Sequence, residues 1–338
     1  AFNKGMVAAF ETLTGKTIVV PPYPHLTGAV GAAKLAYEQV PEGKEFRGFE
    51  TVARGSYSIS SFECKACENR CDVNVFEMEG GQKYHYNDRC ERFSGLQKKD
   101  LSEGLPDLFA EREAFLLACH QPGTTSGPRV GLPRTLMFSE YFPLFCTFFQ
   151  ELGCEVVLSD ATNKRLAKTG VEVTAGEPCF PLKVAHGHFV DVLEKGVDYL
   201  FAPGICDAEQ PNSNYRSSKT CPYVASAPEV IAAALGLPKP GVTCLAPRLY
   251  FSRGERHVGE VLTGVGGKLG RSREQCRQAL EAAFRAQRSF GDQCLRRGRE
   301  AYQALRDDQT AFVVIGRPYA LHDRAVNMDI GRKIQEMG

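Results

Sequence analysis

Four cysteines in the first third of the chain have the spacing of a metal-binding cluster. They are separated by two, three and eighteen residues and are Cys64, Cys67, Cys71 and Cys90. Between the third and fourth, apolar residues alternate on both sides of Gly80-Gly81, which predicts a β-hairpin. The hairpin would return Cys90 to the other three, so that four thiolates share one zinc ion or one [4Fe–4S] cluster. Soft sulfur ligands exclude magnesium and calcium. The alternative is four unpaired structural cysteines.

A second set of cysteines lies later in the chain and consists of Cys179, Cys206 and Cys221. Cys179 stands between Pro178 and Pro181 at the start of a predicted helix, where the positive helix end would stabilise a thiolate or an anionic cluster. Cys221 precedes a proline in a similar position, and Cys206 follows a predicted strand. Three thiolates from three loops would hold a [4Fe–4S] cluster with one iron open. The alternative is three isolated core thiols.

Two histidines, His186 and His188, follow Cys179 on the same predicted helix. Either could donate protons, although a hydrogen-bonded structural role is the alternative for at least one of them.

The elements that would position the second set alternate between strand and helix. Strands are expected at residues 130–132, 154–159 and 197–203, and helices at 135–153, from about 161, and at 179–194. This alternation predicts an α/β domain with a doubly wound parallel sheet. Ligands bind beyond the carboxyl ends of such strands. The loops there hold the three cysteines and Arg134, which should face the same cleft and offer positive charge to an anionic cluster or a CoA group.

The remaining sequence suggests a chain of several parts. Residues 2–14 and 25–36 are expected to be helices, residues 17–20 a buried strand, residues 40–60 loop-like, and residues 311–316 another strand. The chain ends within an apparent helix and lacks an initiator methionine, so we expect a fragment of a longer polypeptide. The expected divisions are residues 1–40, a Cys-rich module at 41–94, a linker at 95–128, the α/β domain at 129–260, a helical linker at 261–310 and the start of a further α/β domain at 311–338.

The composition narrows the class of protein. Forty-one basic residues balance 40 acidic ones in 338 residues, which argues against a nucleic-acid partner. We find no apolar run near the roughly 18 residues that span a membrane and no signal peptide. Thirteen cysteines without secretory features indicate a reducing compartment, and therefore a cytoplasmic protein.

Three segments together resemble one family, the large activators of 2-hydroxyacyl-CoA dehydratases and benzoyl-CoA reductases (CoA-substrate-specific activases). Residues 1–5 and 22–33 look like the tail of an actin/hsp70/sugar-kinase-like ATPase domain, although the Gly-Gly pair that precedes it in the family is missing. Residues 62–93 resemble the Cys-rich segment that follows. Residues 129–134, 179–188 and 221–223 resemble the dehydratase-subunit-like cluster domain of the long fused versions.

The resemblance implies ATP-driven transfer of a low-potential electron in anaerobic metabolism. It implies ATP in the intact protein with Asn3 at the nucleotide, and a catalytic cluster group of Cys179, Cys206, Cys221, Arg134 and His186. The implied partners are a second copy of the chain, the missing N-terminal ATPase and C-terminal dehydratase-like parts or a separate acyl-CoA dehydratase or reductase, and ferredoxin or flavodoxin as electron donor.

This segment lacks the phosphate loops, so we do not expect it to hydrolyse ATP alone. The alternative function is a non-catalytic, zinc-stabilised interaction scaffold. A nicotinamide-dependent oxidoreductase is disfavoured, because we find no glycine-rich fingerprint directly after a strand.

Overall fold

The computed structural model describes the chain in nine stretches, namely residues 4–39, 57–66, 70–78, 80–88, 92–94, 105–123, 126–209, 217–306 and 310–335. The chain divides into two compact units, Ala1–Tyr57 with Met78–Gln82, and Ser58–Glu77 with Lys83–Gly338.

The first unit contains two helices, α1 (Lys4–Thr14) and α2 (Thr27–Gln39), with the short 3-10 helix η1 (Pro24–Leu26) before α2. Both predicted helices are therefore confirmed. The predicted strand at residues 17–20 is wrong: the segment is a loop, and Val19 is 86% exposed. A strand needs a neighbour to pair its N–H and C=O groups, and no strand of the described residues pairs with this segment.

The Cys-rich module is a three-stranded sheet of β1 (Tyr57–Glu63), β2 (Asp72–Met78) and β3 (Lys83–Tyr86), in the order β1-β2-β3. β2 and β3 pair antiparallel, with Asn74 opposite Tyr86, which confirms the predicted hairpin. Gly80 and Gly81 have φ angles of 101° and 78°, which glycine adopts without strain. β1 corrects the prediction of a loop through residue 60. All seven of its residues are exposed, so burial gives it no alternating pattern to recognise.

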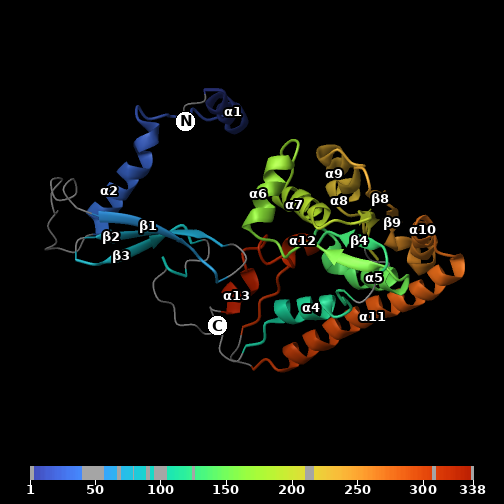
Figure 1. Cartoon of the computed structure of the whole chain (residues 1–338). Helices are drawn as coiled ribbons and strands as arrows, with labels where there is room; N and C mark the ends of the chain where they lie inside the picture. The colour runs from blue at the N-terminus through green and yellow to red at the C-terminus, as the bar shows by residue number, and fades with distance from the viewer. Residues whose placement is uncertain are drawn as a thin grey trace. The chain divides into compact units, whose positions relative to one another are not determined.

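The centre of the larger unit is a four-stranded parallel sheet with strand order β5-β4-β6-β8 (Figure 1). Its strands are β4 (Arg129–Leu132), β5 (Glu155–Leu158), β6 (Tyr199–Phe201) and β8 (Thr243–Leu245), and β7 (Gly204–Asp207) pairs with β9 (Arg248–Tyr250) in a second parallel sheet. The helices that follow the strands are α5 (Phe138–Glu151), α6 (Lys164–Val173), α7 (Phe180–Glu194), α8 (Pro222–Ala225) and α9 (Ala227–Leu235). The predicted α/β class is confirmed.

Helices cover both faces of this sheet, because successive strand residues point to opposite sides. Val156 and Phe201 pack with the aromatic side chains of α5. Their neighbours Val157 and Leu200 pack instead with α7 and α9. The sheet is therefore doubly wound, and both of its faces are buried.

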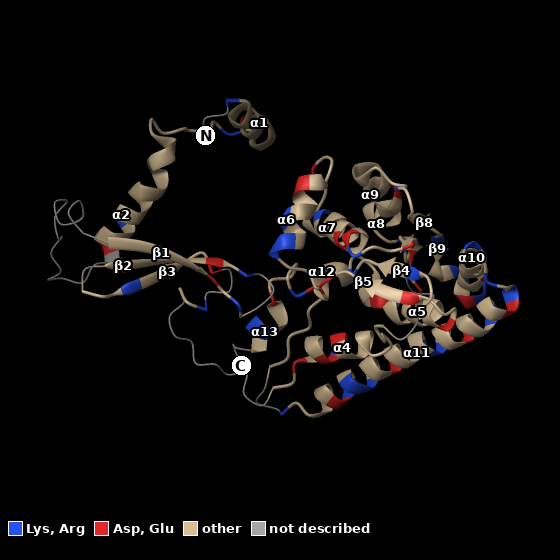
Figure 2. Cartoon of the chain, viewed as in Figure 1, with Lys and Arg blue, Asp and Glu red and all other residues tan. Residues whose placement is uncertain are grey.

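Three segments outside residues 129–260 also belong to this fold. α4 (Leu108–Leu117) lies within the expected linker and packs on α5 and α11. η2 (Phe251–Arg253) and the start of α10 (Gly254–Lys268) lie within the expected α/β domain, and the rest of α10 and α11 (Arg273–Gln303) lie within the expected helical linker. α10 and α11 contribute Leu262, Cys276 and Phe290 to the α5 core. Acidic and basic residues both occur along α11 (Figure 2).

The last described segment contains α12 (Pro318–Leu321) and α13 (Ile330–Gln335). The strand predicted at residues 311–316 is wrong, since the segment is a loop with Val313 and Ile315 85% and 90% exposed. Tyr319 packs into the α5 core. No helix among the described residues is long and apolar enough to span a membrane.

Candidate functional site

A cavity of about 250 Å³ opens at the carboxyl ends of β4 and β5. The loops after these strands, the starts of α5 and α7, α4 and the α12 segment all line it. Its polar lining residues include Arg112, Glu113, Arg134, Ser139, Thr162 and Asp323. This is the edge of a doubly wound sheet at which ligands bind.

Arg134 lies where its position after β4 indicated, in the wall of this cavity. Its guanidinium donates a 2.7 Å hydrogen bond to the Glu113 carboxylate, and its backbone N–H donates to the Ser159 hydroxyl at 2.8 Å. The Arg134 charge is therefore already paired within the domain. Its contact with a cluster or a CoA group stays a prediction.

Cys179 and Cys221 are the N-cap residues of α7 and α8, each followed by a proline within the first two helical positions. Burial raises the pKa of Tyr319, Arg317 opposes this increase, and Cys221 and Cys179 add a smaller electrostatic increase. Two of the three cysteines of the predicted cluster thus occupy equivalent positions, each directly before a helix.

Cys206 has different contacts. Its thiol donates a 3.7 Å hydrogen bond to the Gly204 carbonyl, and its interaction with the Tyr250 hydroxyl raises the pKa of Tyr250. Its backbone carbonyl accepts from the N–H of Thr220, the residue before Cys221, at 3.1 Å. The backbones of Cys206 and Cys221 are therefore close, but the Cys206 sulfur engages Tyr250.

The hairpin cysteines are described only in part. Cys64 and Cys71 are buried, the Cys64 N–H donates to the Cys71 carbonyl at 2.8 Å, and the Ala66 N–H donates to the Cys64 sulfur at 3.5 Å. Cys67 and Cys90 lie outside the described residues, as does Asn3. Within the described stretches, no three or more His, Cys, Asp or Glu side chains are grouped so that they could hold a metal ion. The metal assignments stay predictions.

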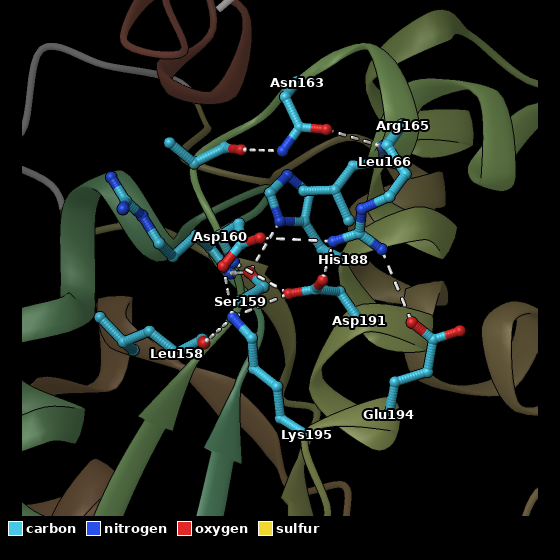
Figure 3. A network of polar contacts seen from close by, with 12 residues as sticks. Leu158, Ser159, Asp160, Asn163, Arg165, Leu166, His188, Asp191, Glu194 and Lys195 are labelled. Atoms are coloured by element: carbon cyan, nitrogen blue, oxygen red, sulfur yellow. Dashed lines mark hydrogen bonds and ion pairs between the residues drawn. The ribbon is translucent and has the colours of Figure 1, made fainter. Parts of the chain in front are cut away.

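The two histidines differ in their surroundings. His186 is fully buried, contacts the Leu182 carbonyl through Nδ1 at 2.8 Å, and does not line the cavity. His188 is also fully buried, with Nδ1 2.7 Å from the Ser159 hydroxyl (Figure 3) and Nε2 2.8 Å from the Thr162 hydroxyl. Burial and the nearby Arg134 charge lower the pKa of His188 to about 3, so its ring is neutral at pH 7.

Asp323 is the residue of this site that the sequence did not indicate. Thr162 donates its hydroxyl proton to Oδ2, and the N–H groups of Ala325 and Val326 donate to Oδ1 at 3.0 Å each. Burial raises the pKa of Asp323 despite these donors. No local motif marks the residue, because its main partner lies 161 positions earlier in the chain.

Only one assignment of hydrogen-bond donors and acceptors around His188 is consistent. Thr162 gives its single hydroxyl proton to Asp323, so it must accept from His188 Nε2–H. Nδ1 then accepts from the Ser159 hydroxyl, which in turn accepts from the Arg134 N–H. This string of hydrogen bonds, from Arg134 through Ser159, His188 and Thr162 to Asp323, holds Asp323 as an acceptor in the cavity wall.

An ion-pair network lies beside this string (Figure 3). Asp191, only 3% exposed, pairs with Arg165 and with Lys195 and accepts from the Asp160 N–H at 2.9 Å. The network joins the end of β5 to the start of α6 and the end of α7, so it fixes the loop that carries Thr162.

These features define a doubly wound α/β domain with a built cavity at its carboxyl edge and two cysteines at adjacent helix starts. Residues 129–338 match the sequence model of the family described as CoA enzyme activase uncharacterised domain (DUF2229), and the chain belongs to this family. No curated protein matches the chain, and no solved structure matches it.

Proposed function

We propose that the chain is the iron–sulfur redox module of an ATP-dependent activator that acts with, or as part of, a 2-hydroxyacyl-CoA dehydratase-like enzyme. The observation that carries the proposal is that Cys179 and Cys221 are both N-cap residues, before α7 and α8, within a family of CoA enzyme activases.

The residues present suit a [4Fe–4S] cluster in part. Cys179 and Cys221 would supply two thiolates, and α7, a helix of 15 residues, would direct its positive end toward the anionic cluster. Cys206 would be the third ligand once its thiol leaves Tyr250. The cluster would supply one-electron transfer. Tyr319, whose pKa is raised, keeps its proton and can donate a hydrogen bond to a thiolate.

The other parts of the proposal concern the intact protein. Cys64, Cys67, Cys71 and Cys90 would hold zinc or a second [4Fe–4S] cluster, and Arg134 and His186 would assist at the catalytic cluster. Residues 1–40, with Asn3, would complete an ATPase domain in a cytoplasmic homodimer. Ferredoxin or flavodoxin would supply the electron.

Anaerobic purification tests the proposal. We expect brown protein with iron, acid-labile sulfide and an electron paramagnetic resonance signal after reduction. Cys179→Ser and Cys221→Ser should each lose the signal of the catalytic cluster, whereas Cys244→Ser, a half-buried control in β8, should keep it. Full iron content and an unchanged spectrum in both Cys179→Ser and Cys221→Ser would refute the assignment.

The buried Cys64 and Cys71 also favour a second candidate, the zinc-stabilised scaffold. Colourless protein with one zinc per chain, lost together in Cys64→Ser and Cys71→Ser, would support that function instead.

A further inference from the structure

The hydroxyl of Ser139 is an anomaly in the cavity wall. Its oxygen is buried and has no hydrogen-bond partner among the described residues, although Ser139 lines the cavity. A buried polar group without a partner destabilises the fold, so such groups are rare and point to an unoccupied role. Alanine would fit this position without that cost.

The arginine side chains around the cavity are already paired with carboxylates. Arg134 pairs with Glu113 and Arg112 pairs with Glu140, both at 2.7 Å. Arg324 pairs with Asp329 at 2.9 Å. An anion entering the cavity would therefore find no uncompensated cation and would meet the Asp323 carboxylate.

A cationic ligand is disfavoured by the same groups. The guanidinium of Arg134 lies near Asp323 and lowers its pKa against the effect of burial. Three protein donors already occupy the Asp323 oxygens. The remaining acceptor capacity of this carboxylate suits one N–H or O–H group.

Phe109, Leu136, Phe138 and Val184 give the cavity an apolar part, and Thr135 and His322 also line it. The volume of about 250 Å³ is below the range of about 300–1,000 Å³ that is typical of small-molecule pockets. The ligand must therefore be a small molecule with a short apolar chain and one polar group.

We propose that this cavity binds a small uncharged molecule whose head carries an acceptor oxygen beside a hydrogen-bond donor, as an amide does. The Ser139 hydroxyl donates to the oxygen, and Asp323 accepts from the donor. Thr162 and His188 are positioning residues, because their hydrogen bonds hold Asp323 with its free acceptor side toward the cavity. The proposal goes beyond the redox function and does not depend on a cluster.

The test uses three probes of equal size, namely butanamide, butanoate and pentylammonium, with the full chain and ligand-observed NMR. We expect saturable binding of butanamide and at least tenfold weaker binding of the two charged probes. Ser139→Ala should weaken butanamide binding about tenfold, or about 1.4 kcal/mol, without lowering the thermal midpoint. The matched control Ser289→Ala, on the exposed side of α11, should leave binding unchanged.

Asp323 and its positioning residues give a second measurement. Thr162→Val should weaken butanamide binding and Thr162→Ser should restore it, because serine keeps the hydroxyl between His188 and Asp323. Equal binding of butanamide by wild type and Ser139→Ala, stronger binding of butanoate or pentylammonium, or no saturable binding of butanamide would each overturn the proposal. These outcomes are independent of iron content, so they are distinguishable from failure of the cluster assignment.

Discussion

Replacing Gly187 with alanine should force two helices of the site apart. α6 and α7 pack so closely that a Cβ on Gly187 would lie 2.0 Å from the Leu166 carbonyl oxygen. A Cβ on Gly170 would lie 2.1 Å from the Lys183 carbonyl oxygen, so the contact is reciprocal. Carbon and carbonyl oxygen approach to about 3.3 Å without strain. Gly187→Ala therefore requires an outward shift of about 1.3 Å.

The atoms that the new methyl group would meet belong to the backbone, so they cannot rotate away. Overpacking in a close-packed interior costs about 1–3 kcal/mol when side chains can adjust. For Gly187→Ala we expect a loss of about 3 kcal/mol in the free energy of unfolding. Because α6 follows Thr162 and α7 begins after Cys179, the shift should also weaken both proposed sites.

Urea unfolding followed by circular dichroism measures this loss, with Gly298→Ala as the matched control. Gly298 lies in α11, and among the described residues no atom is within 4 Å of the position of its added Cβ. Alanine there should gain about 0.5–1 kcal/mol from helix propensity. Hydrogen exchange should increase in residues 164–194 of Gly187→Ala only. If Gly187→Ala were as stable as Gly298→Ala, the close helix packing described above would be wrong.

Two further predictions concern the stability of the domain. The folded-state pKa of His188, about 3, is below the usual value of about 6.5. The stability that the neutral His188 ring contributes is therefore complete above pH 6.5 and is lost as pH falls toward 3. His188→Gln should flatten the dependence of the urea midpoint on pH in this window, and an unchanged slope would contradict the prediction. Ser272 caps α11 in a capping box with Gln275, so Ser272→Ala should cost about 1 kcal/mol, measurable as a lower urea midpoint than that of Ser289→Ala.

The sequence predicted the strands and helices whose apolar residues form a recognisable pattern within a short stretch of chain. The strands at β4, β5 and β6 were recognisable because apolar runs alternate with helices, and the β2–β3 hairpin because Gly80-Gly81 separates two alternating segments. β1 was missed because all its residues are exposed. The apolar run at residues 311–316 was misleading for the opposite reason: Val313 and Ile315 have strand propensity, but the described structure gives them no partner strand.

The candidate site was predictable only where it follows a strand or starts a helix. Arg134 lines the cavity at the carboxyl edge of the parallel sheet, where ligands bind in such folds, whereas the role of Cys179 stays a prediction. Ser139 carries no motif, and its significance depends on a missing partner, which only coordinates can reveal. His186 and His188 could not be ranked from sequence, because the difference between them is the pair of hydroxyls, Ser159 and Thr162, contributed by another loop.

The segment from Arg317 to Val326 explains why the rest of the site was beyond sequence reasoning. Tyr319 and Asp323 both line the cavity, so one short segment contributes two residues to it. Its attachment depends on residues more than a hundred positions earlier, and closing so long a loop has an entropic cost that local propensity does not offset. The compensation comes from the burial of Tyr319 in the α5 core and from the hydrogen bond that Thr162 donates to Asp323. A polar residue such as Asp323 belongs to no periodic sequence pattern. It can be identified as a functional candidate only from the folded structure of the whole domain.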